Sequence, residues 1–181
     1  KIIIAPKRFN VDEGKCIDEL LKLKNMGFDK LYCNNVSHIS IGKKLGFKLF
    51  GGFGLNALNS YTLKLLSEEG LCDTVLSFEM KLSQINSLAD YLPFGIIAYG
   101  KLPLMLVRNC PIKSNVGCKN CTKSLYDRTE RKFSVTCDGT TSEILNSDVL
   151  YLADRLDEIR DVDFITLKFH NENALQVNKI I

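Results

Sequence analysis

The sequence predicts an α/β fold built from repeated βα units, and three observations support this. Over the first hundred residues, short runs rich in β-branched and aromatic residues alternate with stretches of helical periodicity. A glycine stands just past several predicted helices, as at Gly46 and Gly70, where a left-handed backbone costs little. Strand–helix alternation of this kind is typical of a parallel sheet with right-handed crossovers.

The elements follow in order along the chain. The predicted strands are Ile2–Ala5, Lys30–Cys33, Phe47–Phe50, Thr74–Phe78 and Gly95–Tyr99. The predicted helices are Lys15–Asn25, Ser37–Leu45, Ser60–Glu69 and Leu82–Leu92. Residues 101–132 are rich in proline, cysteine and lysine and show no clear period, which favours an irregular loop.

Regular structure resumes after this loop. Asp138-Gly139 between the apolar runs Phe133–Cys137 and Glu143–Leu145 predicts a β-hairpin. A helix at Val149–Ile159 and a strand at Phe164–Phe169 are expected next, and the tail 171–181 begins another helix.

The predicted strands are too few to close an eight-stranded βα barrel, which takes about 250 residues. We therefore expect a half barrel or an incomplete barrel, or else an open α/β sheet. The chain is predicted to be a single α/β domain over 1–181, a fragment of a longer barrel protein, with a Cys-rich metal-binding insertion at 101–147. The missing half barrel, or a second copy in a homodimer, would cover the exposed sheet edge.

Composition limits the function classes. The chain has 181 residues, of which 45% are hydrophobic and 25% charged, as in ordinary globular proteins. No apolar run reaches the roughly 18 residues of a membrane span, and the first residues lack the pattern of a signal peptide. Seven cysteines without a secretion signal argue against a disulfide framework. We therefore expect a cytoplasmic protein without a membrane partner.

Positive charge is concentrated in one segment. Lys101–Lys132 holds eight cations and two acidic residues, a charge of +6 (8 − 2), whereas the whole chain carries +3 and the remainder is therefore −3. Such a segment suits contact with the phosphate backbone of RNA. An alternative is that the cations balance the charge of a metal centre.

Four cysteines, Cys110, Cys118, Cys121 and Cys137, form the strongest chemical signal, with the spacing C-x7-C-x2-C-x15-C. A C-x2-C pair places two thiolates on one tight turn, and both zinc and iron–sulfur centres accept four cysteine ligands. Structural zinc sites more often use two such pairs, so an iron–sulfur cluster is favoured and zinc is the alternative. Cys16, Cys33 and Cys72 lie on apolar faces, and we expect them in the core.

Several segments, taken in order, resemble a known family. They are Gly52–Ser60, Leu76–Glu79, Tyr99–Met105, Arg108–Pro111, Leu125–Arg128 and Glu143–Ser147. Together they are similar to the collagenase-like peptidases of unassigned catalytic type, family thirty-two, and the resemblance runs from about Pro6 to Glu172.

The resemblance implies a TIM-barrel-like domain whose upstream strands are absent. Some members of the family are classed as proteases. Others are oxygen-independent hydroxylases of transfer RNA, ribosomal RNA or the ubiquinone precursor, and they carry a four-iron four-sulfur cluster on four cysteines. This chain most resembles the bacterial branch that hydroxylates a cytidine of large-subunit ribosomal RNA. Its cysteine spacing differs from that of the ubiquinone and transfer-RNA branches.

Candidate active-site residues lie where predicted strands end, because βα barrels carry their active sites at the carboxyl ends of the strands. Those positions include Lys7-Arg8, Asn34-Asn35 and Phe53–Asn59. The candidate catalytic residues are Glu79 as general acid or base, Asn56 and Tyr99. The candidate substrate-binding residues are Asn59, Lys101, Arg108 and Arg128.

Structural alternatives exist for several of these residues. Asn59 could instead cap the helix that follows it, and Arg128 could pair with Asp127. Gly51–Gly54 lacks the Walker spacing, which favours a close backbone approach over a phosphate cradle.

No Ser-His-Asp, Cys-His or H-E-x-x-H arrangement stands out in the sequence. That absence counts against a peptidase activity, metal-dependent or collagenase-like, which is kept as the alternative to the hydroxylase. A zinc-stabilised binding module without catalysis is a further one.

Overall fold

The computed structural model describes residues 2–159 and 162–181, and the chain divides into two compact units. Unit 1 comprises Lys1–Ile97 and Ala153–Thr166, and unit 2 comprises Ala98–Leu152 and Leu167–Ile181. The predicted α/β class is confirmed. The predicted domain over 1–181 includes residues 1, 160 and 161, which lie outside the described residues, and the predicted insertion 101–147 falls within unit 2.

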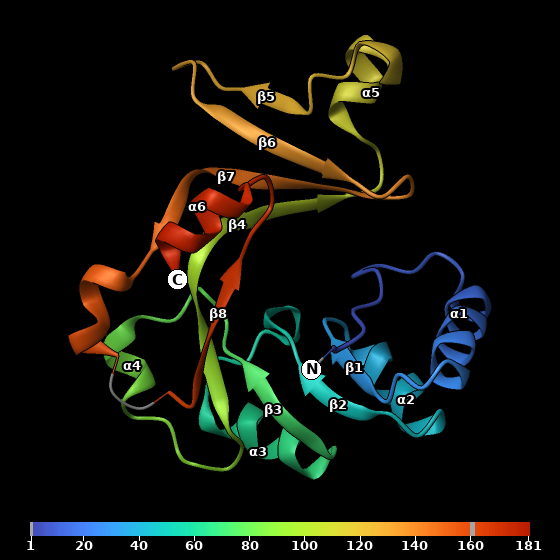
Figure 1. Cartoon of the computed structure of the whole chain (residues 1–181), viewed down its shortest axis with the longest axis vertical. Coiled ribbons are helices and arrows are strands. Elements are labelled where there is room, and N and C mark those ends of the chain that lie inside the picture. Colours follow the sequence, from blue (N-terminus) through green and yellow to red (C-terminus); the bar gives the residue numbers. More distant parts are fainter. Residues whose placement is uncertain (1, 160–161) are drawn as a thin grey trace. The chain divides into compact units, whose positions relative to one another are not determined.

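The sheet of unit 1 is parallel (Figure 1). It pairs β1 (Lys30–Cys33), β2 (Lys48–Gly51), β3 (Leu71–Val75) and the first part of β4 (Phe94–Val107) in that order. These strands fit an incomplete barrel. The predicted strand Ile2–Ala5 is reduced to a bridge at Ile4, whose N–H donates to the Lys30 carbonyl at 2.9 Å. Ile4 therefore covers part of the outer edge of β1.

The helices of unit 1 begin and end where local chemistry favours it. They are α1 (Glu13–Asn25), α2 (Val36–Lys44), α3 (Ser60–Glu68) and the short α4 (Leu82–Ile85), with a 3₁₀ turn, η1, at Phe53–Leu55. Asp12, Asn35 and Asn59 each accept a backbone N–H of the first turn of α1, α2 and α3. Gly46 and Gly70 follow α2 and α3 with φ of 70° and 79°, as predicted.

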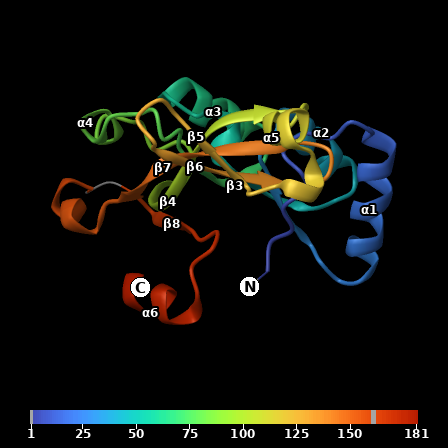
Figure 2. The same ribbon diagram turned by 90° about the horizontal axis from the view of Figure 1, so that it is seen from above.

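The two views of the chain place α1 next to α2 (Figures 1 and 2), and Lys24 Nζ of α1 donates to the Gly46 carbonyl just after α2 at 2.6 Å. Packing against the strands buries the inner faces of these elements. Leu31 of β1, Leu63 of α3 and Leu76 after β3 are at most 1% exposed. The core of unit 1 therefore lies between its helices and its parallel strands.

Cysteines in unit 1 test the predicted core. Cys16 and Cys33 are buried, at 6% and 0% exposure, which confirms the prediction for both. Cys72 is exposed, so the prediction for this residue is wrong. The third strand runs over Leu71–Val75 rather than Thr74–Phe78, so Cys72 lies near its beginning, where its side chain is exposed.

Unit 2 is built on an antiparallel sheet. The second part of β4 pairs with β7 (Ser142–Tyr151), β7 with β6 (Lys132–Cys137), and β6 with β5 (Ser124–Tyr126). The predicted hairpin at Asp138-Gly139 is therefore confirmed. The remaining elements of unit 2 are α5 (Pro111–Val116), the 3₁₀ turn η2 (Cys118–Asn120) and α6 (Ala174–Ile180). Strand β8 (Phe164–Lys168) pairs with β4, and its residues 164–166 belong to unit 1.

Two sequence predictions in this region are wrong. Residues 101–107 continue β4 instead of starting a loop, because Pro103 lies between two register shifts where a strand can tolerate a missing N–H. Residues 149–151 belong to β7 and not to a helix, since Val149, Leu150 and Tyr151 pair with β4. Only a kinked 3₁₀ segment, η3 (Ala153–Glu158), follows.

Within the described ranges, no helix combines the length and the apolar composition that a membrane span requires.

Candidate functional site

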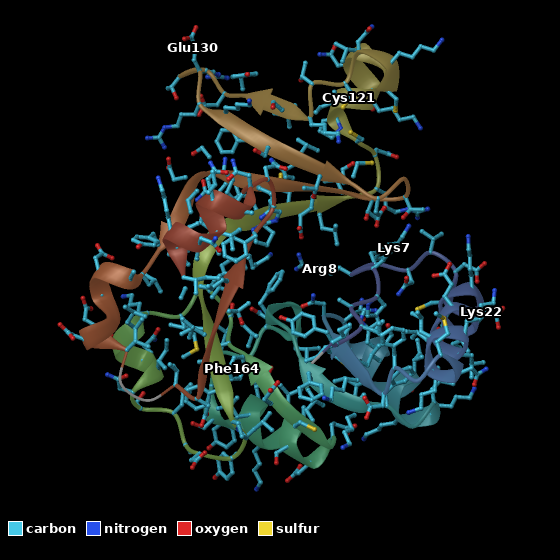
Figure 3. The ribbon with its side chains drawn as sticks, in the orientation of Figure 1. Lys7, Arg8, Lys22, Cys121, Glu130 and Phe164 are labelled. Carbon is cyan, nitrogen blue, oxygen red and sulfur yellow. The ribbon has the colours of Figure 1, made fainter. Side chains whose placement is uncertain are left out.

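All four predicted metal-binding cysteines line one cavity of about 290 Å³ in unit 2. Cys110 immediately precedes α5, Cys118 opens η2, and Cys121 closes it by donating its N–H to the Cys118 carbonyl at 3.3 Å. Cys137 is the last residue of β6. Figure 3 shows Cys121 in the segment that joins α5 to β5. The fold thus gathers thiols from three separate segments.

The cavity is electropositive. Arg108, Lys113 and Lys123 line it together with the cysteines, and no acidic side chain belongs to its lining. The N–H of Lys113 and the neighbouring Ser142 hydroxyl lower the pKa of the Cys110 thiol, against burial, which raises it. The surroundings of Cys110 therefore favour its thiolate form.

Ser142 adds an unpaired polar group to the same wall. Its Oγ atom is buried and has no hydrogen-bond partner among the described residues, although it lies near enough to Cys110 to affect the pKa of that thiol. All seven cysteines are free thiols. Within 2–159 and 162–181, no three Cys, His, Asp or Glu side chains are placed to share a single metal ion.

Asp138 organises the turn that carries Cys137. Its Oδ1 accepts the N–H groups of Thr140 and Thr141 at 2.8 and 2.7 Å, and both threonine hydroxyls also donate to the carboxylate. Burial raises the pKa of Asp138, but these donors outweigh it and lower the pKa to about 2. The β6–β7 turn is therefore held by a charged acceptor rather than by chain connectivity alone.

Alanine at position 138 is expected to destabilise unit 2 by about 1–2 kcal/mol, because the turn N–H groups lose their acceptor. The free energy of unfolding from urea titration measures this. Asp138→Asn keeps one acceptor oxygen and should lose less. Equal stability of Asp138→Ala and the unchanged protein would contradict the role of the carboxylate.

The predicted substrate-binding residues in unit 2 separate in the structure. Arg108 lines the cysteine cavity, and Lys101 lines a second cavity that is described below. Arg128 is exposed in the β5–β6 turn and lines neither cavity. The carboxylate of Asp127 accepts the N–H groups of Thr129 and Arg131 at 2.8 and 3.0 Å, so it shapes this turn through the backbone.

Tyr99 is 9% exposed, and its hydroxyl donates to Glu172 Oε1 at 3.0 Å. Its ring packs on Phe169 and Tyr151. The other oxygen of Glu172 accepts the N–H groups of His170 and Asn171 at 2.6 and 3.0 Å. Tyr99 and Glu172 therefore order the segment between β8 and α6.

The remaining candidates lie in unit 1. Asn56 is exposed and takes a left-handed backbone with φ of 53°, and Glu79 is exposed beyond β3. Their segments are joined by the Ser77 N–H, which donates to the Ala57 carbonyl at 3.0 Å. The Asn59 amide oxygen accepts the Thr62 N–H at 2.9 Å, which confirms its capping role. A substrate-binding role for Asn59 stays a prediction.

The carboxyl ends of β1 and β2 meet as the sequence predicts. Asn34 Oδ1 accepts the Gly54 N–H at 3.2 Å, and the guanidinium of Arg8 lies 5.0 Å from the centre of the Phe53 ring. A Cβ atom at Gly52 or Gly54 would collide with Asn34. The prediction of a close backbone approach at this glycine-rich segment is therefore confirmed.

Three residues of these sites escaped sequence reasoning: Ser142, Glu172 and His170. Ser142 and Glu172 have no distinguishing motif, because their roles come from contacts with distant parts of the chain. His170 directly follows the predicted strand that ends at Phe169, and that position is a signal that could have found it.

Comparison of the chain with protein-family models, with curated proteins and with solved structures gave no significant match.

Proposed function

We propose that this chain is an iron–sulfur domain that hydroxylates RNA, with a cytidine of large-subunit ribosomal RNA as the substrate. The observation that supports it best is the one cavity lined by all four cysteines and three cations. A cluster held by four thiolates carries net negative charge, and Arg108, Lys113 and Lys123 would offset it. The unpaired Ser142 hydroxyl would supply a hydrogen bond to a thiolate or to the cluster.

The spacing of the cysteines favours a cluster, with zinc as the alternative, because structural zinc sites more often use two C-x2-C pairs and this chain has one. In a four-iron cluster each cysteine binds a different iron. Cys110, Cys118, Cys121 and Cys137 would hold the cluster, which supplies electron-transfer chemistry when bound.

The proposed hydroxylation balances without molecular oxygen. A hydroxylated organic donor, D–OH, gives its hydroxyl group to the cytidine and takes the displaced hydrogen, so that R–H plus D–OH gives R–OH plus D–H. Protein groups then have to bind the RNA phosphates, hold the base and exclude water. Lys101 and Arg108 are suited to phosphate contacts, and Glu79, Asn56 and Tyr99 stay candidates for handling the base.

The family, the barrel type and the cellular location are part of the same proposal. The parallel strands of unit 1 suit part of a TIM-barrel-like domain of the collagenase-like peptidase type, completed by further strands or by a second copy of the chain. A cytoplasmic location is part of the proposal, because a reducing compartment would keep the proposed thiolate ligands free of disulfides.

Metal and product analysis test this function. The protein purified without oxygen is expected to contain about four iron atoms and matching sulfide per chain. Expression in cells that lack the modification should add one oxygen atom to a cytidine of large-subunit RNA, detected by nucleoside mass spectrometry. Zinc without iron would favour the binding module, and cleavage of gelatin without RNA modification would favour a peptidase. Either outcome contradicts the hydroxylase.

A further inference from the structure

A second cavity in unit 2, of about 330 Å³, gathers three lysines from separate segments. Lys101 comes from β4, Lys123 directly precedes β5, and Lys132 opens β6. No acidic side chain lines the cavity, and in the described parts of the chain no carboxylate pairs with any of these lysines. Three lysines that line one cavity with no acidic side chain in its wall create a positive potential that attracts an anion.

Neutral hydrogen-bonding groups complete the wall. Ser134 of β6 lines the cavity, and its hydroxyl has no protein partner among the described residues. His170 also lines it, but the Nδ1 atom of its ring is buried beside the Lys168 backbone, out of reach of a ligand in the cavity. A bound oxyanion would accept a hydrogen bond from the Ser134 hydroxyl.

The segment that carries His170 is already ordered. The Glu172 carboxylate accepts two N–H groups at positions 170 and 171 and also accepts the Tyr99 hydroxyl. His170 and Asn171 therefore line the cavity from a segment that hydrogen bonds already hold in place. Binding an anion there costs little conformational entropy.

The two cavities share a wall. Lys123, Val135 and Cys137 line both, so a ligand in the second cavity would lie beside the cysteine cavity. We infer that the second cavity binds a phosphate group, held by Lys101, Lys123 and Lys132 with the Ser134 hydroxyl as a neutral partner. That RNA supplies this phosphate rests on the proposed function; phosphate binding itself does not.

Binding measurements with matched variants test the inference. The probes are inorganic phosphate and cytidine 5′-monophosphate, followed by calorimetry, and a fluorescent single-stranded RNA oligonucleotide, followed by anisotropy, all with the anaerobically purified full chain. Lys101→Gln and Lys132→Gln should each weaken binding of all three probes about tenfold, as expected for a lost charge-assisted hydrogen bond. The control is Lys119→Gln, which removes an exposed cation of η2 that lines neither cavity. It should change binding less than about twofold.

Several outcomes would overturn the inference. Equal losses in Lys119→Gln and Lys101→Gln would mean diffuse attraction to a basic surface. Citrate that competes as well as phosphate would mean a general anion site. Circular dichroism and iron content of the variants must match those of the unchanged protein. Ser134→Ala keeps all charges and tests the site in a second way, because it should weaken phosphate binding a few-fold.

The failure of this inference and that of the proposed function are distinguishable. Lysine-dependent phosphate binding by a protein that holds no iron would support the site and contradict the iron–sulfur function. A protein with about four irons that binds the RNA equally well with and without the three lysines, and binds neither small probe, would leave that function standing and overturn the phosphate site. If RNA binds in a lysine-dependent way and the two small probes also compete for the site, the polymer is the source of the phosphate.

Discussion

Serine in place of Cys118 is expected to reduce the iron bound by the anaerobically purified protein from about four atoms per chain to less than one. Cys118 and Cys121 are the closely spaced pair, at the two ends of η2, so losing either removes an anchor from the same short turn. A hydroxyl is a much weaker iron ligand than a thiolate. Iron and acid-labile sulfide content, together with visible absorbance, measure the effect.

The chain supplies a matched control for this experiment. Cys72 is an exposed thiol on β3 of unit 1 and lines neither cavity of unit 2. Cys72→Ser should keep the iron content of the unchanged protein. Similar iron content in both variants would contradict the assignment of the ligands, whichever metal is bound.

Iron loss is also expected to loosen the segment between β4 and β6. Ile112 is the one buried residue of α5, and η2 has none, so little apolar burial holds residues 108–123 in place. A bound metal centre contributes its binding free energy to folding. Amide hydrogen exchange in this segment should therefore become faster in Cys118→Ser than in Cys72→Ser.

Local rules explain which parts of the fold the sequence predicts well. The strand Lys30–Cys33 has its predicted limits, because its β-branched and aromatic character and its flanking residues are all local. The capping of α3 by Asn59 and the hairpin around Asp138 likewise depend on residues a few positions apart. Each of these is decided by contacts that a short window of sequence contains.

The errors come from contacts between distant residues. β4 continues past Tyr99 because residues 99–101 pair with residues 149–151, some fifty positions away, and the same pairing turns the predicted helix there into strand. Local periodicity carries no information on such a partner. Pro103, which lies in the segment predicted as a loop, is accommodated in the strand by an irregular register.

The two cavities likewise differ in how far the sequence predicts them. Cysteine spacing predicts a common site because a C-x2-C pair must lie on one turn, and the structure places Cys110 and Cys137 on the same cavity. Nothing in the sequence relates Lys101 to His170, which meet at the second cavity through the pairing of β8 with β4. A site whose residues have a fixed spacing can be predicted from the sequence. A site assembled by strand pairing can be recognised only once the fold is known.

Replacing Asp73 of β3 with asparagine is expected to stabilise unit 1 by up to about 3 kcal/mol at pH 7.5. Burial, and then the charge of Asp163, raise the pKa of Asp73 to about 6, from 3.8 in an unfolded chain. The folded state then binds the proton more tightly than the unfolded state, so the stability that this group contributes is present below about pH 4 and is lost as the pH rises through 6. Asparagine is neutral throughout and escapes that loss.

Urea unfolding at two pH values checks both the sign and the size of the change in the free energy of unfolding. The gain from Asp73→Asn should shrink to roughly 1 kcal/mol at pH 4.5, where the folded carboxyl is already protonated. Asp18→Asn, at an exposed position of α1, removes the same charge without the burial and should change stability by less than about 0.5 kcal/mol at both pH values. A gain that is larger at pH 4.5 than at pH 7.5 would contradict the raised pKa. Asp163 Oδ2 accepts the Phe94 N–H at 2.9 Å, which holds at the start of β4 the carboxylate whose charge raises the pKa of Asp73.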